Sequence, residues 1–146
     1  MASPASQRIT TRNIILLDQL NILFSDLAYA RDRVDLLLDQ HPVADHPTVL
    51  MSIGRRGLEM VEDYSRDRDR LKKKLDHLRP FNANPKGSVD AYWALERGQA
   101  ALDSLTEIAR AAAGSPYSIN VIWVTTRTAR SGKRAYSNEA DGVFAT

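Results

Sequence analysis

The sequence predicts a mainly α-helical protein, an antiparallel bundle of three long helices, or of four, followed by a C-terminal β-hairpin. Apolar residues recur at alternating steps of three and four through most of residues 12–114. Prolines divide this region near residues 42–47 and 80–85. Residues 118–128 (SINVIWVTTRT) are instead rich in β-branched and aromatic side chains, which favour a strand. We therefore expect a flexible arm over 1–9, a helical bundle over 10–114, and a hairpin with a tail over 115–146.

The first predicted helix covers residues 12–40 and carries two apolar stripes. The main stripe faces the expected core and consists of Leu16, Leu20, Leu23, Leu27, Ala30, Val34 and Leu37. The second stripe recurs every seventh residue on another side of the helix and consists of Ile15, Ile22, Tyr29 and Leu36. Such a helix is either central in the bundle or covered by another chain. We favour the second interpretation and predict these four residues as an oligomer interface.

The second predicted helix runs from Pro47 to about Leu78, with one apolar seam that ends in Leu71, Leu75 and Leu78. Gly54 and Gly57 bracket two arginines near its start. Each glycine costs a helix about 1 kcal/mol relative to alanine. The pair therefore marks a close helix–helix approach, a kink, or a break into two helices.

The third predicted helix is capped by Ser88 and stops at the Gly114-Ser115-Pro116 sequence. Its predicted buried side includes Leu95 and Leu102. Residues 130–133 form the expected hairpin turn, with residues 134–137 as the returning strand.

Composition excludes several function classes. The chain has no cysteine, so disulfides, thiol catalysis and cysteine metal sites are absent. No apolar run reaches the ~18 residues of a membrane span. There is no nucleophile elbow, phosphate loop or dinucleotide motif, and the three histidines match no metal-ligand spacing. We therefore expect no enzyme activity, no cofactor, no metal and no small-molecule substrate.

Basic residues give two candidate binding surfaces, although the net charge is only +2. The predicted hairpin tip has no acid among its basic residues and suits nucleic acid or an acidic partner; it consists of Arg127, Arg130, Lys133 and Arg134. A secondary basic face on the second helix consists of Arg66, Arg70, Lys72, Lys73 and Lys74. Interleaved aspartates make this face either a solvated helix surface or a ridge that follows phosphates.

These observations predict a non-enzymatic, self-associating structural or adaptor subunit of coat, connector or scaffold type, by analogy of shape with bundle-type virus or phage subunits. It would be cytoplasmic, or assembled in a virus-like particle. The alternative is a nucleic-acid-binding regulator that uses the second helix and the hairpin tip. A third hypothesis is a helical ribonuclease, since the spacing of Arg70 and His77 is similar to the arginine–histidine pair of helical ribonuclease toxins. The polar residue that follows the arginine in those toxins is Leu71 here.

Overall fold

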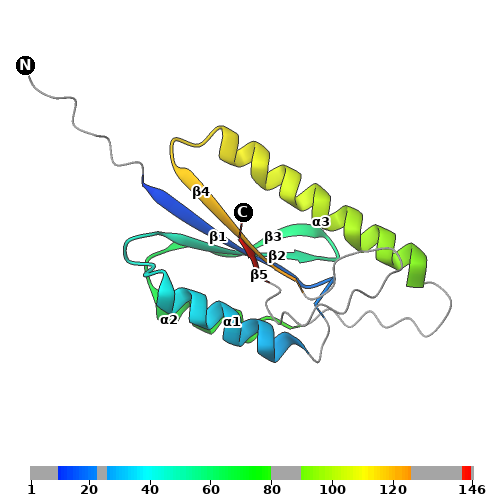
Figure 1. The fold of residues 1–146 in the computed structure, drawn as a ribbon, viewed down its shortest axis with the longest axis horizontal. Helices are drawn as coiled ribbons and strands as arrows, with labels where there is room; N and C mark the ends of the chain where they lie inside the picture. Colours follow the sequence, from blue (N-terminus) through cyan, green and yellow to red (C-terminus); the bar gives the residue numbers. More distant parts are fainter. Residues whose placement is uncertain (1–9, 23–25, 80–89, 126–142, 146) are drawn as a thin grey trace, which may run out of the picture.

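The protein is an α/β fold, in which a mixed sheet separates two helical layers (Figure 1). The computed structural model describes residues 10–22, 26–79, 90–125 and 143–145. In chain order, their elements are β1 (Thr11–Asp18), α1 (Leu27–Gln40), β2 (Thr48–Gly54), β3 (Gly57–Ser65), α2 (Arg68–His77), α3 (Asp90–Ala113), β4 (Ser118–Val124) and β5 (Val143–Ala145).

The sheet has the order β3-β2-β1-β4-β5, with β1 at its centre. Strand β1 pairs in parallel with β2 on one side and with β4 on the other. Strands β3 and β5 are antiparallel to their neighbours. Because β1 is covered on both faces, its residues from Asn13 to Asp18 are all buried.

Successive β1 side chains enter two different cores. Ile15 and Leu17 pack with buried residues of α1 and with Leu71 and Leu75 of α2. Residues Ile14 and Leu16 pack on the opposite face, beneath α3. Figure 1 shows this division, with α1 and α2 on one side of the sheet and α3 on the other. The alternation places adjacent residues of β1 in opposite layers.

The predicted helical bundle is wrong, because the residues of the first predicted helix form a strand and a separate helix. Residues 11–18 form β1, and only 27–40 are helical. A central parallel strand is buried on both faces and therefore reads as a continuous apolar run. Such a run also contains apolar residues at helical spacing. Leu16 and Leu20 therefore fall on the same predicted helical stripe as the residues of α1.

The second predicted helix is wrong over residues 48–65, which form the β2–β3 hairpin. Gly54 and Gly57 pair with each other across its tight turn. Gly57 has φ +93°, a left-handed conformation that glycine adopts without a side-chain clash. The two glycines therefore mark a hairpin turn, which none of the three helical interpretations included. Only 68–77 of the expected helix is helical, as α2.

Several local predictions are confirmed. Helix α1 ends before His41-Pro42, α3 ends at Ala113, and residues 118–124 form a strand. The expected arm over 1–9 and the hairpin turn and return over 130–137 lie outside the described residues. The analogy with virus or phage subunits fails with the bundle, because it depended on that shape. No helix within the described ranges is both long and apolar enough to cross a membrane.

Candidate functional site

A buried polar cluster lies where the parallel strands β1 and β4 end. Asp18 closes β1 and is fully buried, and Asn21 in the following turn and Thr125 after β4 are also buried. The chain runs from β1 through α1 to β2, which lies on one side of β1 in the sheet, while β4 lies on the other side of β1. Open α/β sheets bind ligands at such a switch point, outside the carboxyl ends of the strands. This edge is therefore the first place to look for a site.

The Asp18 side chain organises the turn that follows β1. The Asn21 side-chain amide donates to Asp18 Oδ2 at 2.7 Å, and the backbone amides of Asn21 and Ile22 donate to the Asp18 carbonyl at 3.0 and 2.9 Å. Asn21 Nδ2 also lies 3.4 Å from the Arg97 carbonyl of α3. The cluster thus connects the end of β1 to the helix above it.

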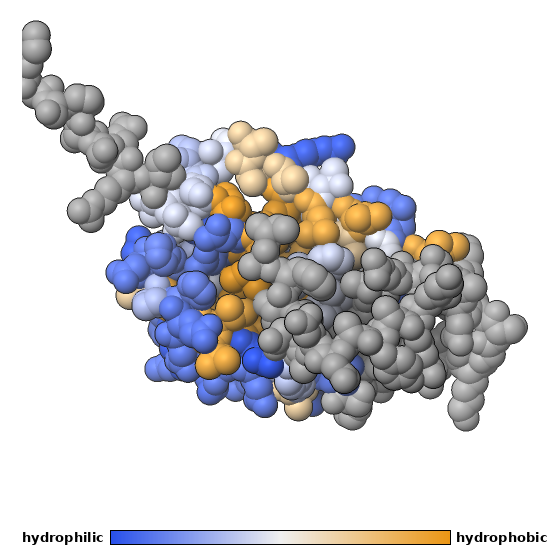
Figure 2. All heavy atoms as spheres, in the orientation of Figure 1, coloured by the Kyte–Doolittle hydropathy of each residue, from blue (hydrophilic) through white to orange (hydrophobic). Residues whose placement is uncertain are grey.

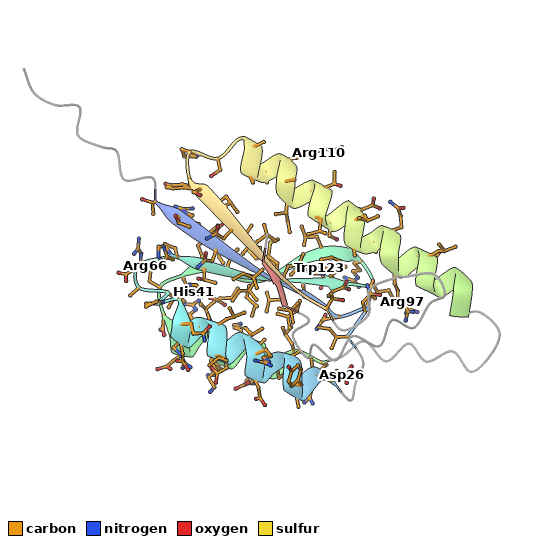
Figure 3. All side chains as sticks on the ribbon, in the orientation of Figure 1. Asp26, His41, Arg66, Arg97, Arg110 and Trp123 are labelled. Carbon is orange, nitrogen blue, oxygen red and sulfur yellow. The ribbon has the colours of Figure 1, made fainter. Side chains whose placement is uncertain are left out.

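Burial raises the pKa of the Asp18 carboxyl above its ordinary value of 3.8. The Asn21 side-chain amide, the nearby Trp123 indole and the local backbone amides oppose this shift without cancelling it. Trp123 lies beneath α3 (Figure 3), and its Nε1 and Asp18 Oδ1 are both buried without a well-formed hydrogen bond to a described residue.

The polar side chains of this cluster are the Asp18 carboxyl, the Asn21 amide and the Thr125 hydroxyl, and the apolar residues Leu20 and Ile22 flank Asn21 in the sequence. In the part of the chain that the structure describes, no three His, Cys, Asp or Glu side chains gather as a metal site would require. The hydrogen bonds of the cluster support the turn after β1.

The residues of the predicted secondary basic face lie on and just before α2. Lys72 Nζ lies 2.9 Å from Asp35 of α1, and its pKa is raised by that hydrogen bond. Arg70 and Lys74 both pair with Glu62 of β3. Arg66 donates to the Ala44 carbonyl, near His41 at one end of the molecule (Figure 3).

Much of the charge on α2 thus joins neighbouring elements. Arg68, outside the predicted set, pairs with Asp35 at 2.9 Å and Asp39 at 2.7 Å and so links α2 to α1. His77 Nδ1 lies 2.6 Å from the Lys73 carbonyl on the same helix. Arg70 forms its ion pair with Glu62 of β3.

The four residues of the predicted oligomer interface do not share one surface. Ile15 and Ile22 are buried in the core between the sheet and α1. Tyr29 and Leu36 are exposed on α1, where Arg33 Nε donates to the Tyr29 hydroxyl at 2.8 Å. The predicted hairpin-tip residues Arg127, Arg130, Lys133 and Arg134 lie outside the described residues.

Helix α3 exposes apolar side chains on the face opposite the sheet. Leu95 is 74% and Leu102 is 59% exposed, whereas Ala101, Ser104 and Ile108 on the other face are buried. Residues seven apart lie on the same side of a helix, so Leu95 and Leu102 continue into the exposed Ala109. We call Leu95, Leu102 and Ala109 the outer stripe of α3. The sequence predicts Leu95 and Leu102 on the buried side of this helix, because an apolar stripe alone does not indicate which partner covers it.

Comparisons with known proteins provide no function. No protein-family model matches the chain, and no curated protein sequence matches it. One solved structure that it resembles is the conserved hypothetical protein BatB from Bacteroides thetaiotaomicron, with 14% sequence identity and a TM-score of 0.48. The match covers 93% of this chain and 80% of that one. Likeness at this level does not indicate a function for this chain.

Proposed function

We propose that this chain is a non-enzymatic, self-associating adaptor module and that the outer stripe of α3 binds a second copy. The observation that supports this is the exposure of Leu95 and Leu102, two large apolar side chains one above the other on a single helix face. Apolar residues gathered on one exposed face are typical of interaction surfaces. The packed opposite face already fixes the helix on the sheet, so the stripe is presented without any rearrangement.

Burial of the stripe supports a weak dimer. Covering one leucine contributes about 1.5–3 kcal/mol, and a two-fold pair covers four leucines. Association itself costs about 4–15 kcal/mol. At the favourable ends of both ranges the balance is about 8 kcal/mol, which corresponds to a micromolar dissociation constant, so the stripe supports at most a weak dimer and not a permanent one.

The test is light scattering after size-exclusion chromatography, at protein concentrations of about 5–500 µM, a range that includes such a dissociation constant. The mass should rise from monomer to dimer with concentration. Leu102→Lys should keep the protein monomeric throughout, because the ammonium group would be buried against the partner. Circular dichroism should show the same helix content for both proteins.

The matched control is Leu36→Lys, which changes a similarly exposed leucine, 45% accessible, on α1. This variant should dimerise like the unmodified protein. A monomer at every concentration refutes the adaptor proposal. Loss of the dimer in Leu36→Lys, together with normal behaviour of Leu102→Lys, would transfer the interface to α1 and contradict the role given to α3.

A further inference from the structure

An apolar groove of about 360 Å³ opens between the C-terminal half of α3 and the sheet. Figure 2 shows hydrophobic surface between that helix and the strands. The groove lies under the sheet-facing side of α3 and is distinct from the outer stripe. Apolar side chains from four strands and α3 form its walls, chiefly Ile14, Val49, Met51, Leu58, Ile108 and Ile119.

One cation lies at the edge of this groove where β1 and β4 begin. The Arg12 guanidinium carbon is 3.6 Å from the ring centre of Tyr117 and 4.8 Å from that of Tyr64. The two rings hold the guanidinium plane in place through cation–π contacts. Burial raises the pKa of Tyr64, which the charge of Arg12 opposes, so the hydroxyl stays neutral beside the cation.

Arg12 has no counter-ion among the described residues. Its Nε is buried and has no hydrogen-bond partner. Glu107 also lines the groove, but its side chain is exposed and forms no ion pair with Arg12. A buried N–H without an acceptor is costly, and a carboxylate is the group whose two oxygens match a guanidinium edge.

We propose that this groove binds an amphipathic carboxylate, with its aliphatic chain against the apolar walls and its carboxylate on Arg12. Three features of the groove support this occupant. The walls favour an aliphatic chain, the guanidinium is held in place but unpaired, and the volume lies at the small end of the range for small-molecule sites, about 300–1,000 Å³. Self-association through the outer stripe does not depend on this ligand.

The first experiment is isothermal titration calorimetry with decanoate, decanol and decylamine. These probes share one chain and differ in the charge of the head group. Decanoate should bind at least about tenfold more tightly than decanol, as one hydrogen-bonded charged contact implies, and decylamine should bind more weakly still. Arg12→Met should reduce decanoate affinity to that of decanol, whereas Arg12→Lys should retain part of the difference. Arg55→Met, a change at the distant β2–β3 turn, should leave decanoate affinity unchanged.

A second variant tests the groove without altering Arg12. Ala111→Trp places an indole on the helical wall, at an exposed position that the core does not need. It should abolish decanoate binding while the circular dichroism spectrum is unchanged. Ala44→Trp, an exposed alanine in the loop before β2, is the matched control and should bind as before.

Three results would overturn the proposal. One is equal affinity for decanoate and decanol, and another is the absence of saturable decanoate binding. The third is that Ala111→Trp weakens self-association and not decanoate binding, which would show that a second copy occupies the groove.

Discussion

The same substitution at two leucines, Leu71→Ala and Leu102→Ala, separates this fold from a helical bundle. In the predicted bundle both leucines lie on buried seams, so both changes would destabilise. In the structure Leu71 is 2% exposed and anchors α2 in the core, whereas Leu102 is 59% exposed on α3. The two variants should therefore differ strongly.

The magnitude follows from burial. Removing a buried leucine side chain costs about 2–5 kcal/mol, because transfer free energy is lost and a cavity remains. Complete burial places Leu71 near the middle of that range, about 3–4 kcal/mol. This is a large fraction of the about 5–15 kcal/mol that stabilises a typical domain. Leu102→Ala should stay within about 0.5 kcal/mol, since little apolar contact is lost and alanine favours a helix.

Urea unfolding followed by circular dichroism measures both changes, at a protein concentration too low for self-association. In a separate thermal unfolding experiment with the same signal, the melting temperature should fall by roughly 6–16 °C for Leu71→Ala and hardly at all for Leu102→Ala, at about 2–4 °C per kcal/mol. Equal losses in the two variants, or a loss below about 1 kcal/mol for Leu71→Ala, would refute the assignment of these leucines to core and surface.

Two further predictions concern the turns. The pKa of Asp18 is raised in the folded state, so its contribution to the free energy of unfolding is complete below pH 3.8 and is lost as the pH rises through the folded-state value. Asp18→Asn should remove this decline in a series of urea titrations across pH, and an unchanged pH profile would contradict it. Gly57→Ala should cost about 1–3 kcal/mol because φ is +93°, although nothing lies within 4 Å of the added methyl group. Gly54→Ala, with its nearest atoms at 3.8 Å, is the control and should cost clearly less in the same assay.

The sequence predicts the elements whose signals are local. Proline and glycine residues mark the C-terminal ends of α1 and α3, and β-branched residues mark β4. Asp67 caps α2, since its side chain accepts from the Arg70 backbone amide at 3.2 Å. The sequence does not predict this cap, because the predicted second helix continues through Asp67. The β2–β3 hairpin has a sequence signal that favours it over a helix. Gly54 and Gly57, separated by two residues, follow a segment that is rich in β-branched residues.

The site residues were harder to predict because they come together only in the sheet. Arg12, Tyr64 and Tyr117 belong to three separate segments, and the strand pairing brings them to one edge. Asp18 had a local signal, a polar residue that ends a run of apolar ones. Its meaning required the knowledge that this run is a central parallel strand. The exposure of Leu102 depends on which face of α3 the sheet occupies, which periodicity does not specify.

The central position of β1 has a consequence for synthesis on the ribosome. One edge of β1 pairs with β2 soon after it emerges, but the other must wait for β4; the Asn120 amide that donates to Asn13 at 3.3 Å is 107 residues away along the chain. At about 5–20 residues per second, this delay lasts roughly 5–20 s. Contacts between such distant segments also slow folding. The nascent chain therefore carries an open, strongly apolar strand edge for seconds, and this is the interval in which chaperone binding would raise the yield of folded protein most.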